Sequence, residues 1–136
     1  MKTGQAIVEV IIAFAVATIA ILGLVQVATK SVANAGAAKR AAQATAYAME
    51  GMEWITGERD STDWQAFYAR SGLYCISVLA WGSPCGPIGT TEYSRTVTMT
   101  PGVVNSVQQM TVTVTVSWNE GSRIATESQT SEFTAY

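Results

Sequence analysis

A long apolar run near the N-terminus limits the folds that are open to this chain. Residues 10–25 are apolar except for Thr18, and short apolar stretches on either side extend the run over residues 5–29. The hydrocarbon core of a bilayer is spanned by about 20 mostly apolar helical residues. No proline interrupts residues 5–57. The sequence therefore predicts one long helix whose first part is able to span a membrane.

The second part of this predicted helix, residues 30–57, has a different character. It is rich in alanine and amphipathic, with Tyr47, Gly51 and Trp54 at helical spacing. We expect this stripe to pack against a sheet rather than to bind a ligand. Gly57 is the predicted end of the helix, because a polar connection follows it.

Beyond the helix the pattern changes to the alternation that is typical of β-strands. Met110 to Trp118 places apolar side chains on one face and hydroxyl side chains on the other. Pro101-Gly102 is expected to end the strand before it, and residues 119–122 to form a hairpin loop. The predicted strands are residues 73–80, 93–100, 110–118 and 123–133.

These elements predict an α+β fold. The long N-terminal helix, membrane-spanning in its first half and amphipathic in its second, would pack on an antiparallel sheet of about three or four strands. The predicted organisation is a short N-terminal segment at residues 1–4, a membrane helix at 5–29, an amphipathic helix half at 30–57 and a globular β-rich domain at 58–136.

The composition argues against several classes of function. Charged residues make up 13% of the chain, about half the usual share. The net charge is −2 with no basic cluster, so nucleic-acid binding is not indicated. Histidine is absent, as are the common nucleophile and phosphate-binding motifs. Asp60 and Asp63 are too few for a calcium site. We therefore expect no enzyme activity, no cofactor and no metal.

Two cysteines, Cys75 and Cys85, lie close together in the distal part of the chain. Their spacing fits no zinc-binding pattern. An oxidised pair in an extracytoplasmic compartment is the favoured interpretation. Two reduced, buried thiols are the alternative.

Glu9 places a carboxylate just inside the apolar run. A charge in the hydrocarbon region costs at least a few kcal/mol, so such a residue is expected to have a partner. Because Glu9 is near the end of the predicted helix, its side chain could instead reach the water at the interface.

The N-terminal residues resemble those of type IV prepilins and type II secretion pseudopilins. The resemblance rests on Gly4, on the glutamate five positions later, on the very short basic leader and on the long apolar helix. In that family a membrane-embedded aspartyl peptidase cleaves after the glycine and methylates the new N-terminal amine. The resemblance implies that residues 1–4 are a leader peptide, cut between Gly4 and an N-methylated Gln5. Many members begin the mature chain with phenylalanine or methionine, which is a difference from Gln5.

The resemblance also implies a function and a set of partners. The chain would be a structural subunit of an extracellular pilus-like filament, with the alternative of a minor pseudopilin of a type II secretion system. It would cross the cytoplasmic membrane once before assembly, and afterwards belong to a pilus or a periplasmic pseudopilus. Its partners would be other pilin subunits, the prepilin peptidase, the inner-membrane assembly machinery and membrane lipid. Glu9 would accept the N-terminal ammonium of a neighbouring subunit, and a disulfide between Cys75 and Cys85 would fix a distal loop.

An ordinary signal peptide is the main rival interpretation. Ala33-Asn34-Ala35 has the small residues of a signal-peptidase site. Against it, the apolar run is longer than a usual signal core, contains Glu9, and is separated from the site by Lys30.

Overall fold

The computed structural model describes the backbone of residues 2–135 and the side chains of residues 5–135. The fold is α+β, with a long N-terminal helix and a four-stranded antiparallel sheet, as the sequence predicts. The chain divides into two compact units, residues 1–39 and residues 40–136. Helix α1 (Lys2–Ser61) supplies residues to both units. We refer to them as unit 1 and unit 2.

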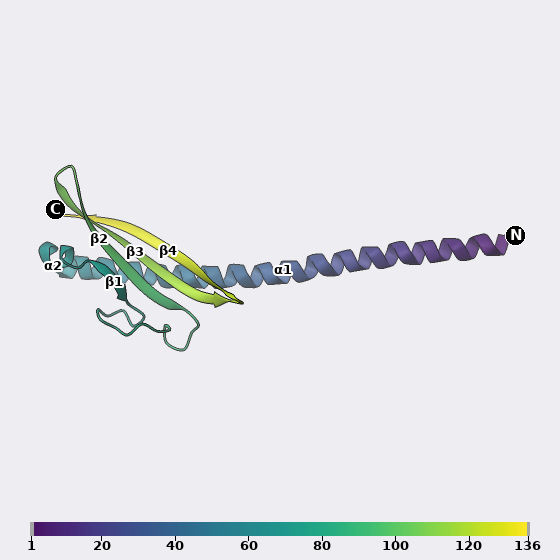
Figure 1. Cartoon of the computed structure of the whole chain (residues 1–136), viewed down its shortest axis with the longest axis horizontal. Helices are drawn as coiled ribbons and strands as arrows, with labels where there is room; N and C mark the ends of the chain where they lie inside the picture. Colours follow the sequence, from purple (N-terminus) through teal and green to yellow (C-terminus); the bar gives the residue numbers. More distant parts are fainter. Residues whose placement is uncertain (1, 136) are drawn as a thin grey trace. The chain divides into compact units, whose positions relative to one another are not determined.

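Unit 2 contains the sheet and the last part of α1. Its four strands are antiparallel and adjacent in chain order, β1-β2-β3-β4 (Figure 1). A short helix precedes them. The elements after α1 are α2 (Trp64–Tyr68), β1 (Gly72–Cys75), β2 (Ser94–Val104), β3 (Val107–Glu120) and β4 (Arg123–Thr134).

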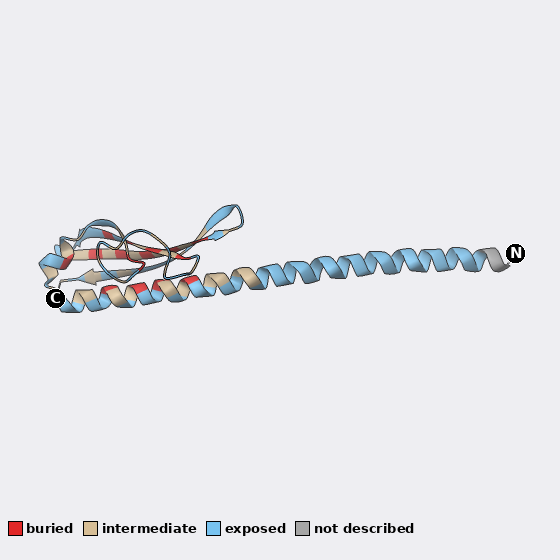
Figure 2. Cartoon of the chain, turned by 90° about the horizontal axis from the view of Figure 1, so that it is seen from below, coloured by how far each residue is buried: buried red, intermediate tan, exposed pale blue. Residues whose placement is uncertain are grey.

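The core of unit 2 lies between α1 and one face of the sheet. The apolar positions of β3 predicted from the alternation are buried, from Met110 to Trp118. Ala44, Ala48 and Ile55 of α1 are buried as well, and the small alanines allow the helix backbone to approach the strands closely. Figure 2 shows buried positions on the strands and on these turns of α1. Phe67 of α2 and the loop residues Ile76 and Tyr93 are buried too. Because Ala44, Ala48 and Ile55 contribute to this core, unit 2 includes most of the predicted amphipathic helix half together with residues 58–136.

The end of α1 differs from the prediction. The helix continues through Gly57 and ends at Ser61. An exposed glycine inside a helix costs only about 1 kcal/mol. The carboxylate of Glu58 accepts a hydrogen bond from Trp81 Nε1 at 2.5 Å, which fixes the last turn to the rest of unit 2. The next helix begins after Asp63, whose Oδ2 accepts a hydrogen bond from the backbone N of Gln65 at 3.0 Å.

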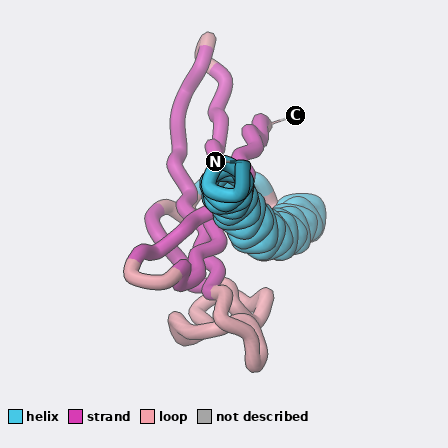
Figure 3. Tube along the Cα trace, turned by 90° about the vertical axis from the view of Figure 1, so that its right-hand side faces the viewer, coloured by secondary structure: helices cyan, strands magenta, loops and turns pink. Residues whose placement is uncertain are grey.

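The first strand is shorter than predicted. β1 ends at Cys75, so the prediction of a strand over residues 73–80 was wrong beyond that residue. Leu79 has a φ of 50°, a left-handed conformation that does not fit a ladder. The hydroxyl of Ser83 donates to the carbonyl of Cys75 at 2.6 Å and holds the chain in a reversal. Residues 76–93 therefore form a long loop, the cluster of loop below the strands in Figure 3.

The prediction that Pro101-Gly102 ends a strand was also wrong, because β2 continues to Val104. β1 pairs only with residues 96–99, so the later part of β2 lies at an open edge. A proline is tolerated in such an edge position. The reversal falls instead at Asn105-Ser106, whose φ values of 51° and 66° suit a two-residue hairpin turn.

The turn between β3 and β4 is tighter than predicted. Asn119 and Glu120 belong to β3, and Gly121-Ser122 alone connect it to β4. Gly121 has a φ of 66°, which glycine adopts without strain.

A buried arginine joins three parts of unit 2. Arg95 lies on β2 and its side chain is 1% exposed. Its Nη1 donates to the carbonyl of Tyr47 on α1 at 2.7 Å and to Glu50 Oε2 at 2.8 Å. Its Nε donates to the carbonyl of Ile76 at 3.2 Å. A charge buried this deeply is tolerated because its donors are paired.

Gly51 provides the space for this arginine. A Cβ atom at position 51 would lie 2.9 Å from Arg95 Cδ and 2.9 Å from Val114 Cγ1. Because Arg95 and Val114 are both buried, their side-chain atoms have little room to move. Gly51 is therefore required by packing, whereas a Cβ at Gly57 would meet no atom within 4 Å.

We expect opposite effects from alanine at these two glycines. Overpacking at position 51 costs about 1–3 kcal/mol, which outweighs a helix-propensity gain of up to about 1 kcal/mol. Gly51→Ala should therefore lower the free energy of unfolding, and Gly57→Ala should raise it. Denaturant titration of the full chain in detergent micelles, followed by tryptophan fluorescence, measures both. Equal stabilisation by the two substitutions would show that Arg95 does not need the space at Gly51.

Candidate functional sites: the uncovered helix and the disulfide loop

The apolar surface of unit 1 has no cover within that unit. Residues 5–35 are all helical and all exposed. The exposed fractions include 72% for Phe14, 72% for Ile19 and 71% for Leu24. Among the described residues one helix, Gln5–Ser61, contains a stretch long and apolar enough to cross a membrane. A continuous apolar surface of this size is stable only in lipid or against other chains.

Glu9 is the polar side chain in this stretch that finds no hydrogen-bond partner on its own helix. Between residues 6 and 25 the polar side chains are Glu9 and Thr18. The hydroxyl of Thr18 donates to the carbonyl of Phe14 at 2.7 Å, so its own helix satisfies it. The Glu9 side chain is exposed and has no hydrogen-bonding or ionic partner among the described side chains. A partner for this carboxylate must come from outside the helix.

The residues of the predicted cleavage site lie at the limit of what is described. Gly4 is outside the residues whose side chains the structure describes, and Gln5 is the first inside. One helical turn separates Gln5 from Glu9, about 6 Å along the axis. A charge at position 5 and the Glu9 carboxylate of the same helix would therefore lie one turn apart in depth in an apolar layer.

Unit 2 carries a second candidate site around its disulfide. Cys75, at the end of β1, is bonded to Cys85 in the loop, with their Cα atoms 5.0 Å apart. The hydroxyl of Ser77 donates to the carbonyl of Gly86 at 2.5 Å, which ties the loop to itself a second time. These contacts fold residues 76–93 against the start of β2, where Pro87 forms a bridge with Ser94 and the backbone N of Ile76 donates to the carbonyl of Arg95.

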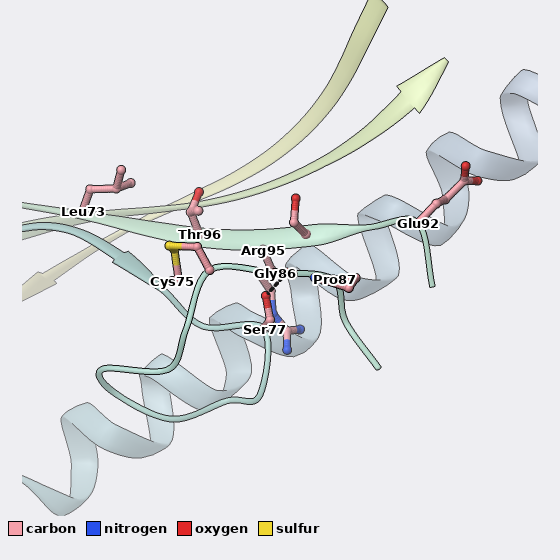
Figure 4. Close-up of a pocket in the computed structure, with 10 residues that line it drawn as sticks. Leu73, Cys75, Ser77, Gly86, Pro87, Glu92, Arg95 and Thr96 are labelled. Carbon is pink, nitrogen blue, oxygen red and sulfur yellow. Dashed lines mark hydrogen bonds between the residues drawn. A yellow bond between two sulfur atoms is a disulfide. The ribbon is translucent and has the colours of Figure 1, made fainter. Parts of the chain in front are cut away.

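A pocket of about 500 Å³ lies between this loop and β2 (Figure 4). Hydroxyl groups line it, and the carboxylate of Glu92 contributes a negative charge. Arg95 also lines it, but its guanidinium is bonded to Glu50 and to two carbonyls. The hydroxyls of Ser77 and Ser94 are bonded as well, to the Gly86 carbonyl and to Ser117. The pocket therefore offers mostly apolar surface, with the Thr96 hydroxyl and one carboxylate, rather than a pair of free acid and base groups. Its lining residues are Leu73, Cys75, Ser77, Cys85, Gly86, Pro87, Glu92, Ser94, Arg95 and Thr96.

An aromatic cluster attaches the disulfide loop to α1. The ring of Trp81 lies 5.0 Å from that of Trp54 on α1 and 5.4 Å from that of Tyr74 on β1. The guanidinium of Arg70 lies 4.4 Å from the Trp81 ring, in cation–π contact. Sequence analysis did not assign Trp81 this role, because its partners are distant in the chain. The helical spacing of Trp54 was the sequence signal that this side of α1 packs against the rest of the chain.

Tyr93 closes the other end of the loop. Its hydroxyl lies 3.1 Å from Gln43 Oε1 and 3.3 Å from the carbonyl of Arg40. Burial raises the pKa of this phenol, the Glu92 carboxylate adds to the rise, and the Arg40 charge opposes it. The phenol therefore stays protonated at neutral pH as a donor. Its contribution to stability is present below the ordinary tyrosine pKa of about 10 and is lost as the pH rises through the raised pKa.

Comparison with known proteins yields no relative: no family model, no curated protein and no solved structure matches this chain. The fold and the sites define the class of protein by its architecture alone. The chain has an α+β unit with a disulfide-bonded loop, on a helix that is able to cross a membrane.

Removal of the disulfide should destabilise unit 2. Cys75 and Cys85 are ten positions apart, and closing a loop of that size contributes roughly 2–3 kcal/mol. We expect the double substitution of Cys75→Ser and Cys85→Ser to lower the free energy of unfolding by that amount. Reductant should lower the stability of the wild-type chain equally and leave the double variant unchanged. Free thiols that react with iodoacetamide in unreduced native protein would contradict the pairing.

Proposed function

We propose that the chain is a structural subunit of an extracellular pilus-like filament, assembled through its N-terminal helix. The observation that carries the proposal is an apolar helical surface over residues 5–29 that contains one carboxylate, Glu9, with no partner among the described side chains. The similarity of residues 4–9 to the prepilin cleavage segment supports the same function. We propose that the chain crosses the cytoplasmic membrane once before assembly. Its partners would be other pilin subunits, the prepilin peptidase, the inner-membrane assembly machinery and membrane lipid.

The energetics of the helix favour two successive environments. Before assembly, lipid covers the apolar side chains, and Glu9 is close enough to the helix end for its carboxylate to reach the interface. In a filament, the helices of neighbouring subunits cover one another instead. Leaving the lipid then costs little apolar burial, because one apolar environment replaces another.

Cleavage between Gly4 and Gln5 supplies the group that Glu9 lacks. It removes residues 1–4 and exposes an ammonium at Gln5, which methylation leaves charged. An ammonium and a carboxylate are each expensive in an apolar layer, but they become a pair when one helix docks beside another. Because the two groups lie one turn apart on each helix, the pair also sets the axial offset between neighbours.

Unit 2 would lie outside the apolar layer in either environment. Its core is complete without unit 1, since its helical residues, its sheet and its disulfide all belong to residues 40–136. Assembly therefore requires no refolding of unit 2. A minor pseudopilin of a type II secretion system would use the same helix chemistry, and it differs in that the polymer stays in the periplasm.

Substitutions at Glu9 test the proposal. We expect Glu9→Ala protein to be made, cleaved after Gly4 and folded in the membrane, yet to be poorly incorporated into filaments, because the incoming ammonium would enter an apolar core without a partner. Glu9→Gln keeps shape and hydrogen bonding without the charge, so its incorporation should be intermediate. The measurement is the ratio of tagged variant to wild type in filaments from cells that express both.

Thr18→Ala is the matched control, because it removes a polar group of the same helix that is already satisfied internally. It should incorporate as well as wild type. Equal incorporation of Glu9→Ala and wild type would show that charge pairing at Glu9 does not drive assembly.

A further inference from the structure

Strand β4 is a regular, open edge of the sheet. It has β3 on one side, and all 12 of its residues pair with β3 in an unbroken register. Within residues 2–135 no strand pairs with its other side. The strand contains no proline, no lysine and no bulge, which are features that often protect an edge from pairing. It has one other such feature, the charge of Glu127 on its core face. β4 therefore presents a long backbone edge to an incoming strand.

The core face of β4 is polar and partly uncovered. Glu127, Gln129 and Ser131 pair with Val116, Val114 and Val112 of β3, and those valines are fully buried. Paired residues share a face of the sheet, so these three polar side chains point toward the side that α1 covers. Gln129 is nonetheless exposed, and the other two are half-buried. Helix α1 therefore covers the core face of β3 but leaves the middle of β4 partly exposed.

A groove of about 200 Å³ lies between α1 and this part of β4. Met49 and Met52 give it an apolar surface, and Met49 is 52% exposed. Methionine side chains are flexible and adapt to ligands of different shape. Glu53 adds an acidic group to the groove, and Glu127 is a second carboxylate on the same face of β4. The full lining is Met49, Met52, Glu53, Thr56 and Gln129.

We propose that β4 and this groove bind an extended segment of another protein by strand addition. The backbone of the segment pairs with the open edge of β4, and every second side chain enters the groove. The groove selects apolar side chains through its methionines and a lysine or arginine through Glu53 and Glu127. The site belongs to unit 2 and does not depend on processing or on filament assembly.

The charges favour a different protein over a second copy of this chain. An antiparallel pair of two β4 strands in one continuous sheet places the core faces of both copies on the same side. The Glu127 carboxylates of the two copies are then near one another across the two-fold axis, and like charges in such positions repel. A basic segment meets the same carboxylates favourably.

The test uses the full chain in detergent micelles and a synthetic peptide. The peptide has about nine residues, enough to pair with most of the strand, and alternates threonine with valine around a central lysine. Hydrogen–deuterium exchange should slow at the amides of residues 124–133 when the peptide binds. Glu127→Lys should weaken binding about tenfold and should favour a peptide with a central glutamate instead.

Glu132→Lys is the matched control, because Glu132 lies on the same strand but pairs with Thr111 and points to the opposite face. It should leave the affinity for the lysine peptide nearly unchanged. Equal weakening by both variants, or no slowing of exchange at β4 with either peptide, would overturn the proposal. So would a slowing that depends on the concentration of the chain alone, since the occupant would then be a second copy.

Discussion

The guanidinium of Arg95 connects the parts of unit 2 that the chain alone would leave separate. It bonds to the carbonyl of Tyr47 on α1, to the carbonyl of Ile76 where β1 has ended, and to the carboxylate of Glu50. Removing the arginine side chain takes a donor away from the carbonyls of Tyr47 and Ile76, and a buried acceptor left unsatisfied costs about 1–3 kcal/mol. Gly51 is part of the same arrangement, because only a residue without a side chain leaves room for the arginine. The position of the helix on the sheet and the start of the disulfide loop both depend on this contact.

Units 1 and 2 differ in whether their polar groups have partners within the same unit. In unit 2, the buried guanidinium of Arg95 and the hydroxyl of Ser77 are bonded to groups of the same unit. In unit 1, the apolar surface is uncovered and Glu9 has no partner among the described side chains. The core of unit 2 is formed within the unit, whereas the apolar surface of unit 1 needs cover from lipid or from other chains. These properties are expected of a subunit whose helix makes the contacts between copies. This contrast is the physical basis of the proposed function.

The parts of the fold that follow from local pattern were predictable. The alternation from Met110 to Trp118 fixes β3, since each buried residue is two positions from the next. The end of β1 was not predictable, because it depends on contacts with Ser83 and Arg95 that are distant in sequence. Pro101 misled the prediction, because a proline ends a central strand but is tolerated at an edge.

The candidate sites divide in the same way. Glu9 was found from sequence because a carboxylate in an apolar run is conspicuous, whereas its proposed partner belongs to another molecule. Arg95 was missed, although it is in phase with the buried Val97 and Met99 of β2, and that phase was a signal for a buried charge. The open edge of β4 could not be predicted, because the order of strands in a sheet is a tertiary property.

The most direct test of the central claim is the identity of the first residue of the chain in filaments sheared from the surface of cells that make it. Peptide mapping by mass spectrometry gives this residue and its modification. We expect the chain to be abundant in the sheared fraction and to begin with N-methylated Gln5. A chain that is confined to membranes and retains Met1 would contradict the proposed function, and so would a soluble chain that begins at Gly36.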